Sequence, residues 1–226
     1  MSVKKQAEGP AKKKIFIVDD HPMMRDGLAQ MIANEPDLSL CGEAENASEA
    51  LQKIEKLRPD LALVDITLRS GSGLELIKDL QTRLPTVAVL VISMHDESLY
   101  AERVLRAGGR GYIMKQEGGK KLMEAIRQVL NGQTYISPKI SAKIVDAFTG
   151  RRSESSSAVE ALTDREFEVF QLIGGGLSTK EIADKLHVSP KTVEVHRVNM
   201  KQKLNVATAP ELIRFAVRWV ESQKPA

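Results

Sequence analysis

The chain has 226 residues, of which 42% are hydrophobic, and a formal net charge of +3. This length suits two domains better than one. The single cysteine, Cys41, excludes an internal disulfide framework. No apolar run approaches the roughly 20 residues of a membrane-spanning helix. Because no apolar segment follows Lys4 and Lys5 either, we expect no signal peptide, no membrane partner and a cytoplasmic location.

Residues 1–13 are polar and basic, without periodicity, and predict a disordered tail. From residue 14 to 134, short apolar runs alternate with amphipathic segments. The runs that predict strands are Ile15–Val18, Leu38–Ala44, Leu61–Val64, Val87–Ile92 and Gly111–Met114. Predicted helices follow them near 23–33, 46–57, 73–83, 97–107 and 118–130. Five such repeats predict an α/β doubly wound, five-stranded parallel sheet that is covered on both faces.

Polar side chains follow the carboxyl ends of four of these strands. Asp19 and Asp20 follow the first strand, Asp65 the third, Ser93 the fourth and Lys115 the fifth. Doubly wound sheets bind ligands at this edge. Two adjacent carboxylates raise each other's pKa unless a cation lies between them, and hard oxygen ligands suit Mg²⁺. Taken one at a time, an Asp pair at a strand end is most often a turn and helix cap, and a lysine there is usually a solvated charge.

The set as a whole resembles the receiver domain of two-component response regulators, a flavodoxin-like fold. The motifs are "LALVDITLRSGSGLEL" around Asp65, "VLVISMHDE" around Ser93 and "GYIMK" at Lys115. The resemblance implies that a cognate histidine kinase donates a phosphoryl group to Asp65. Lys115 would pair with the phosphoryl oxygens, Ser93 would hydrogen-bond one of them, and Tyr112 would fill the space that Ser93 leaves. The ligands of Mg²⁺ (or Mn²⁺) would be Asp19, Asp20 and Asp65.

Two positions depart from the receiver pattern. Arg69 stands where the loop after the acceptor often has proline, and Gln116 stands where a cis-proline often follows the lysine. A cis bond before a residue other than proline costs about 2.5–4 kcal/mol, so we expect a trans peptide before Gln116. His21 and His95 are expected only to line the rim of the site.

Residues 135–160 predict a linker that contains one short helix. The helix begins at Ser137–Pro138, and the polar, Ser-rich stretch "RRSESSSAVE" follows it. Residues 161–226 carry a net charge of +2 and form the second predicted domain. Its helix starts are three capping boxes and one Ser–Pro start, at Thr163–Glu166, Ser178–Glu181, Thr208–Glu211 and Ser189–Pro190. These signals predict a small all-α domain of four helices.

The stretch "LTDREFEVFQLIGGGLSTKEIADKLHVSPKTVEVHRVNMKQKLNV" resembles the DNA-binding domain of LuxR/NarL/FixJ-type regulators. The resemblance implies a helix-turn-helix, with Thr179–Leu186 first, a turn at His187–Ser189 and Pro190–Lys203 as the recognition helix. Helical spacing puts the packed face at Val193, His196, Met200 and Leu204. His196 is interpreted as a core histidine and not as a metal ligand.

The opposite side of the recognition helix carries Lys191, Val195, Val198 and Gln202, with Glu194 at its flank. Val195 and Val198 suit thymine methyl groups and sugar edges. Glu194 would accept a hydrogen bond from cytosine or exclude wrong bases. The candidate phosphate contacts are Lys180, Lys191, Thr192, Arg197 and Lys201. The mild basic charge permits nucleic-acid binding without requiring it.

The last helix, Ala209–Val220, has more apolar residues than one packed face requires. Ile213, Val217 and Trp219 are the predicted interface of a homodimer that forms on phosphorylation. Half-sites on DNA one helical turn apart would follow from this symmetry.

The sequence therefore predicts a transcriptional response regulator that is not an enzyme. One alternative is a haloacid-dehalogenase-type phosphatase, but that class needs Asp-x-Asp after the first strand, where this chain has Asp19–Asp20–His21. The chain also lacks room for a cap domain. The other alternative is a receiver fused to a protein-binding helical module, which salt-dependent DNA binding would distinguish from a DNA-binding output.

Overall fold

The computed structural model describes residues 11–68, 71–148, 158–159 and 161–223. Most of the predicted tail, Arg69 and most of the Ser-rich linker lie outside these ranges. The chain divides into two compact units, one of residues 1–96 and 103–136 and the other of residues 97–102 and 137–226. None of the helices in the described ranges is long and apolar enough to cross a membrane.

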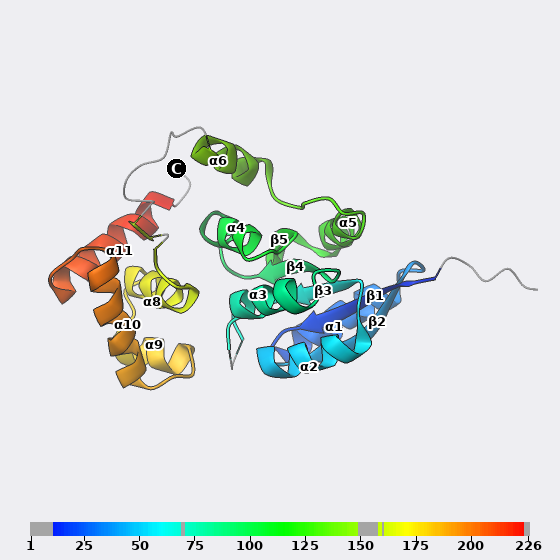
Figure 1. Ribbon diagram of the computed structural model, residues 1–226, viewed down its shortest axis with the longest axis horizontal. Helices are drawn as coiled ribbons and strands as arrows, with labels where there is room; N and C mark the ends of the chain where they lie inside the picture. Colours follow the sequence, from blue (N-terminus) through cyan, green and yellow to red (C-terminus); the bar gives the residue numbers. More distant parts are fainter. Residues whose placement is uncertain (1–10, 69–70, 149–157, 160, 224–226) are drawn as a thin grey trace, which may run out of the picture. The chain divides into compact units, whose positions relative to one another are not determined.

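The first unit is built on a parallel sheet of five strands in the order β2-β1-β3-β4-β5 (Figure 1). The strands are β1 (Lys13–Val18), β2 (Leu38–Ala44), β3 (Leu61–Val64), β4 (Ala88–Ser93) and β5 (Gly111–Met114). This is the flavodoxin-like order, so the predicted doubly wound fold is confirmed. β1 begins two residues before the prediction because Lys13 and Lys14 pair with β2. β4 lies one residue later than predicted because its last residue, Ser93, pairs with Met114.

One helix follows each strand. These helices are α1 (Pro22–Ala33), α2 (Ala47–Leu57), α3 (Gly73–Arg83), α4 (Glu97–Arg106) and α5 (Gly119–Leu130). A 3₁₀ turn, η1 (Lys115–Glu117), lies between β5 and α5. The described residues contain no cis peptide bond, which confirms the trans peptide expected before Gln116.

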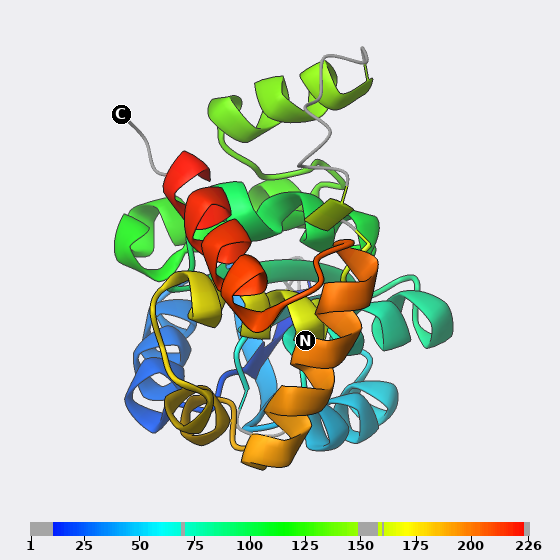
Figure 2. The same cartoon turned by 90° about the vertical axis from the view of Figure 1, so that its left-hand side faces the viewer.

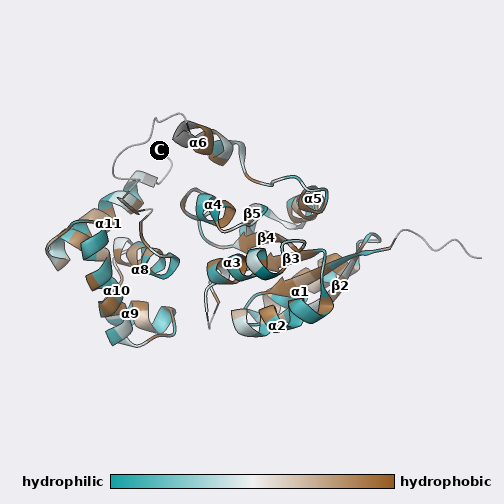
Figure 3. Ribbon diagram, viewed as in Figure 1, coloured by the Kyte–Doolittle hydropathy of each residue, from teal (hydrophilic) through white to brown (hydrophobic). Residues whose placement is uncertain are grey.

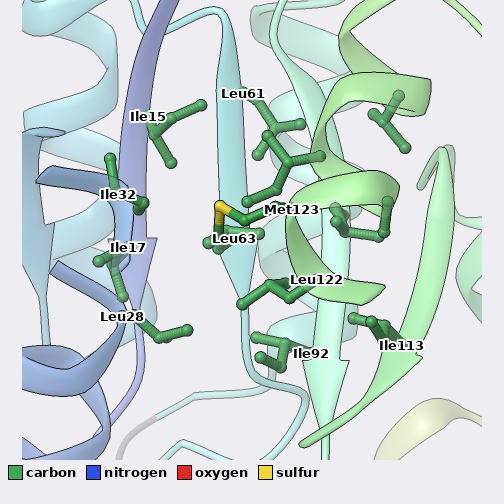
Figure 4. Close-up of a cluster of buried hydrophobic side chains, with 14 of the residues drawn as sticks. Ile15, Ile17, Leu28, Ile32, Leu61, Leu63, Ile92, Ile113, Leu122 and Met123 are labelled. Atoms are coloured by element: carbon green, nitrogen blue, oxygen red, sulfur yellow. The ribbon is translucent and has the colours of Figure 1, made fainter. Parts of the chain in front are cut away.

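The sheet is apolar on both faces because helices cover both. The central strands β3 and β4 are mostly brown in the hydropathy colouring of Figure 3, whereas the helices are of mixed colour. Figure 4 shows α1 and α5 packed on one face, with Leu28 and Ile32 of α1 and Leu122 and Met123 of α5 against alternate strand residues. Each fully buried side chain of this kind contributes roughly 1.5–3 kcal/mol. This burial fixes the strands, and therefore the residues at their ends.

The second unit contains five described helices. They are α6 (Pro138–Phe148), α8 (Asp164–Gly174), α9 (Thr179–Lys185), α10 (Pro190–Lys203) and α11 (Ala209–Gln223). Figure 2 shows α10 in orange and α11 in red, joined by a short connection. Phe167 and Phe170 of α8 pack edge-on against Trp219 of α11, with ring centroids 5.5 and 5.7 Å apart.

The predicted helix starts of this unit are confirmed. Thr163 and Ser178 each form a capping box with the glutamate three residues later. Thr208 and Glu211 exchange the same pair of hydrogen bonds. At α10 the side chain of Ser189 accepts from the amide of Thr192 at 3.0 Å, with Pro190 as the first helical residue. Local sequence signals thus define where these four helices begin.

Candidate functional site

Strand register brings the acidic residues together at one edge of the sheet. Val18 of β1 pairs with Val64 of β3, so Asp19 and Asp65 leave neighbouring strands at equivalent positions. Asp19, Asp20 and Asp65 are buried, with 0%, 8% and 3% of their surface exposed. Carboxylate oxygens of these three residues and a ring nitrogen of His21 lie within 4.8 Å of one another. The cluster that was predicted from the strand ends is therefore present.

Lys115 joins this cluster from the end of β5. Its Nζ donates to Oδ2 of Asp19 at 2.6 Å and to Oδ2 of Asp65 at 2.7 Å. Only 4% of the lysine side chain is exposed. The β5 register explains this position, because Met114 pairs with Ser93 and the next residue passes the end of β4. One buried ammonium therefore lies between two buried carboxylates.

Burial and charge shift the pKa values of Asp65 and Lys115. Burial raises the pKa of Asp65 to about 6, although Lys115 works against the shift and Asp19 adds to it. Burial by itself would lower the pKa of Lys115, but the charges and hydrogen bonds of Asp65 and Asp19 outweigh it and raise the pKa. The lysine is therefore fully charged at neutral pH and stabilises the ionised form of Asp65.

The donor set fits a hard divalent cation. Three buried carboxylates lie near one ammonium, that of Lys115. The guanidinium of Arg25 does not neutralise them, because it pairs with Glu45 at 2.7 Å. A dication would balance the remaining negative charge, and carboxylate oxygens with only partial protein coordination are typical of Mg²⁺ sites. Nδ1 of His21 lies 2.7 Å from Oδ1 of Asp20, so this histidine touches the acidic cluster itself and not only its rim.

The predicted switch residues Ser93 and Tyr112 are buried and hydrogen-bond the loop that follows β4. Ser93 is fully buried, and its Oγ accepts from the amide of His95 at 3.2 Å. Tyr112 is 1% exposed and donates its hydroxyl proton to the carbonyl of His95 at 2.8 Å. The hydroxyl of Thr67 lies 2.9 Å from Nε2 of His95. His95 therefore links the loops that follow β3 and β4, a role that the rim prediction missed.

Two further residues contact the backbone of the acidic cluster, and sequence reasoning missed both. A Cβ on Gly73 would lie 2.2 Å from the main-chain oxygen of Asp65, so only glycine fits at the start of α3. Arg25, which is 7% exposed, donates to the main-chain oxygen of Asp19 at 2.7 Å. The available signal for Arg25 was its place on the apolar stripe of α1, one and two turns before Leu28 and Ile32.

The helix-turn-helix consists of α9 and α10, with a turn whose residue His187 has a left-handed φ of 51°. Val193, Met200 and Leu204 are buried, which confirms their predicted place on the packed face. His196 is half-buried on the same face. Burial and nearby Arg165 lower its pKa, so it is neutral at pH 7, in line with a core histidine.

The predicted DNA-contacting residues lie on the accessible side of this motif. Val195 and Val198 are 52% and 48% exposed, so neither belongs to the packed face of α10. The lysines at 180 and 191 are exposed, whereas the lysine at 201 is partly buried. Thr192 hydrogen-bonds its hydroxyl to the N-cap Ser189 at 2.8 Å. Glu194 and Arg197 share the hydroxyl of Thr179, a residue that the predicted contacts did not include.

The predicted dimer residues of α11 differ in their surroundings. Ile213 is 41% exposed, whereas Val217 is partly buried. Trp219 is also partly buried, and its ring packs against α8. Its role in a dimer stays a prediction, because the indole already contributes to the core of its own unit.

Two known protein families match the chain. Residues 15–127 match the response regulator receiver domain, and residues 160–216 match the bacterial regulatory proteins of the luxR family. The oxygen regulatory protein NreC of Staphylococcus carnosus (strain TM300) is 35% identical over 210 residues, which cover 91% of this chain and 97% of that protein. NreC of Staphylococcus epidermidis (strain ATCC 12228 / FDA PCI 1200) is 35% identical over 211 residues, with the same coverage. The chain belongs to the LuxR family of response regulators.

As a LuxR-family response regulator, the chain is a DNA-binding transcription regulator of a two-component system. A two-component response regulator of the LuxR family from Aurantimonas sp. SI85-9A1 is 29% identical, with a TM-score of 0.57 over 62% of this chain and 99% of that one. RcsB from Salmonella enterica serovar Typhimurium, bound to promoter P1flhDC in the presence of BeF3⁻, has a TM-score of 0.61 over 92% and 99% of the two chains. At 23% identity, RcsB shows the shared fold alone.

Membership in this response-regulator family also decides between the alternatives. Both family matches are to regulators and neither is to a phosphatase. The luxR-family match to residues 160–216 supports a DNA-binding output and not a protein-binding one.

Proposed function

We propose that this regulator is switched by phosphorylation of Asp65, in a reaction that depends on a divalent cation. The observation that carries the proposal is the position of Lys115, whose Nζ lies 2.7 Å from Oδ2 of Asp65 and 2.6 Å from Oδ2 of Asp19. A buried ammonium at this point stabilises the carboxylate form of the acceptor and later the negative charge of a phosphoryl group.

In the proposed reaction an oxygen of Asp65 attacks the phosphorus of a phosphohistidine on the cognate kinase. A P–O bond forms, the P–N bond breaks, and the imidazole of the donor keeps the electron pair and takes up a proton. Asp19, Asp20 and Asp65 would hold Mg²⁺ or Mn²⁺, which supplies charge neutralisation for the transferring phosphoryl group. The contribution of this chain is positioning and electrostatics, and the acceptor loses its phosphoryl group later by hydrolysis.

The response to phosphorylation would pass through Ser93 and Tyr112. Ser93 is buried at the end of β4 and would turn its hydroxyl towards the new phosphoryl oxygens. Tyr112 is already buried, with its hydroxyl on the carbonyl of His95, so it is placed to follow any movement of that loop. A change of this kind biases an element with two states.

The proposed output is a cytoplasmic homodimer on double-stranded DNA. α10 would enter the major groove, with Val195, Val198 and Glu194 against base edges. The phosphate contacts would be Lys180, Lys191, Thr192, Arg197 and Lys201, and the dimer contacts Ile213, Val217 and Trp219. A structure of two RcsB dimers bound to two parallel DNAs supports this arrangement by fold similarity alone.

The acceptor is tested by intact mass after incubation with a small phosphoryl donor and Mg²⁺. We expect one phosphoryl adduct on the wild-type chain and none on Asp65→Asn or after chelation of the metal. Asp60→Asn is the matched control, because Asp60 stands before β3, where its carboxylate binds the ammonium of Lys13 and the amide of Lys14. An adduct that persists in Asp65→Asn would refute the assignment.

A further inference from the structure

A hydroxyl outside the recognition helix joins two charged residues on it. The side chain of Thr179, at the first position of α9, donates to Oε1 of Glu194 at 2.9 Å. Nη1 of Arg197 donates to the same hydroxyl oxygen at 2.8 Å. Glu194 and Arg197 also form an ion pair at 3.7 Å across one turn of α10. The three side chains therefore form one network between the two helices of the helix-turn-helix.

The chemistry of this network allows only one direction of hydrogen bonding. A carboxylate only accepts, a guanidinium only donates, and a threonine hydroxyl has one proton to give and lone pairs to accept with. The proton of Thr179 must therefore point to Glu194, and its lone pair to Arg197. Thr179 is itself held in place, because Ser178 before it caps α9 through its box with Glu181.

The network includes a residue of the surface of α10 that we propose to contact base edges. Glu194 precedes the exposed Val195 directly, and its own side chain is 57% exposed. An ion pair with so exposed a partner contributes little to stability, so stability alone does not account for it. Oε1 already accepts from Thr179, whereas Oε2 keeps both of its lone pairs for the amino group of a base.

We propose that Thr179 is a positioning residue for sequence recognition, which sets the carboxylate of Glu194 and the guanidinium of Arg197 without itself reading a base. This inference rests on the proposed role of α10 as the reading helix. Without the hydroxyl, Glu194 and Arg197 are free to close their 3.7 Å ion pair into a direct hydrogen bond, and the carboxylate no longer has one fixed direction. The preference of Glu194 for one base pair therefore depends on Thr179, which is a residue of α9.

The expected effect is a loss of discrimination at a single position of the DNA site. One good contact to a base edge discriminates by roughly 5- to 100-fold, so we expect the preference at that base pair to fall about 10-fold in Thr179→Val. The dependence of binding on salt should not change, because Thr179 carries no charge and the substitution leaves the charge of Arg197 in place.

The experiment uses the full-length chain, first with and without a small phosphoryl donor and Mg²⁺. All later measurements use whichever of the two forms binds DNA. A duplex library with a randomised segment gives the preferred sequence of the wild type, and Kd is then measured for every single base-pair change. Thr179→Val removes the hydroxyl at nearly constant volume, whereas Thr179→Ser restores it. Glu194→Ala and the double variant Thr179→Val/Glu194→Ala complete a cycle, and circular dichroism and melting verify the fold of each.

We expect Thr179→Val and Glu194→Ala to lose preference at the same base pair, Thr179→Ser to keep it, and the double variant to lose no more than Glu194→Ala alone. The inference is overturned if Thr179→Val keeps every base-pair preference, or if its affinity falls equally for all sequences, as a structural defect would cause. If Lys191→Ala and Val195→Ala also leave binding unchanged, α10 does not read DNA, and the proposed function fails with the inference.

Discussion

Gly73 and Asp65 approach each other so closely that a Cβ on residue 73 would stand 2.2 Å from the carbonyl oxygen of Asp65. The amide of Gly73 also donates to the carbonyl of Ile66 at 2.9 Å. The first turn of α3 is thus in direct contact with the backbone of the proposed acceptor, and any side chain there must push the two apart.

We therefore expect Gly73→Ala to displace the backbone at Asp65 and to slow phosphoryl acceptance by about 10- to 100-fold, because a shift of about 1 Å can have that effect on a positioned reaction. The rate is measured by intact mass against time with a small phosphoryl donor and Mg²⁺. Gly27→Ala is the control, because a Cβ at this position of α1 meets no atom within 4 Å. Equal rates in the two variants would contradict the prediction.

Divalent cations should stabilise the first unit by binding the cluster of Asp19, Asp20 and Asp65. A ligand at 100 times its Kd stabilises the folded state by about 2.7 kcal/mol, so we expect a rise in Tm with Mg²⁺ or Mn²⁺ by calorimetry. Asp20→Asn should lose most of the rise because it removes one of the three carboxylates. Asp60→Asn should retain it. A rise of the same size in Asp20→Asn would place the ion elsewhere.

Charge and shape on α10 should have separable effects on DNA binding. Lys191→Ala should weaken binding to all sequences alike and reduce the slope of log K against log salt by about 0.9. Val195→Ala should leave the slope unchanged and reduce the preference at a thymine. Affinity measured at several salt concentrations on preferred and unrelated DNA tests both. A change of slope in Val195→Ala would indicate that the valine acts through the fold of the helix.

The second unit should lose stability in acid through Glu166. This side chain is 4% exposed, and Nζ of Lys203 donates to it at 2.6 Å. Burial works to raise the pKa of Glu166, but the hydrogen bonds from Lys203 and Thr163 outweigh it and hold the pKa below its usual 4.5. Because the folded-state pKa is the lower one, this stabilisation is present above pH 4.5 and is lost as the pH falls through the folded-state pKa.

We expect Glu166→Gln to lower the unfolding free energy of this unit by about 1–2 kcal/mol at neutral pH and to flatten its acid dependence. Trp219 is the only tryptophan of the chain and packs on α8, so its fluorescence during denaturation in urea reports this unit. Glu181→Gln is the matched control, since Glu181 fills the same place in a capping box but is exposed and hydrogen-bonds only Ser178. If both variants keep the acid dependence of the wild type, Glu166 is not its source.

Much of this architecture follows from local sequence. The apolar runs gave the strand positions to within two residues because burial on both faces leaves them almost free of polar residues. The acidic cluster followed from the topology, since parallel strands end at one edge. The capping boxes could be predicted because the side chains of Ser or Thr and of a glutamate three residues later hydrogen-bond each other's backbone amides within one turn.

The features that the sequence did not predict are contacts between segments that are far apart along the chain. The need for glycine at residue 73 arises only when α3 meets the end of β3, and nothing in the local sequence indicates that approach. The hydrogen bond of Thr67 to His95 spans 28 positions, and that of Thr179 to Glu194 spans 15. Such pairs are set by packing, so a pattern read along the chain does not contain them.

The pairing of the strands has a consequence for engineering. Asp19, Asp65 and Lys115 directly follow three different strands, and the register of the sheet brings them together. A deletion of one residue within β1 would turn the side chains that follow the deletion to the opposite face of the sheet. It would remove Asp19 from the acidic cluster even if the loops were unchanged. The strand ends that carry these residues must therefore be transplanted together as one block.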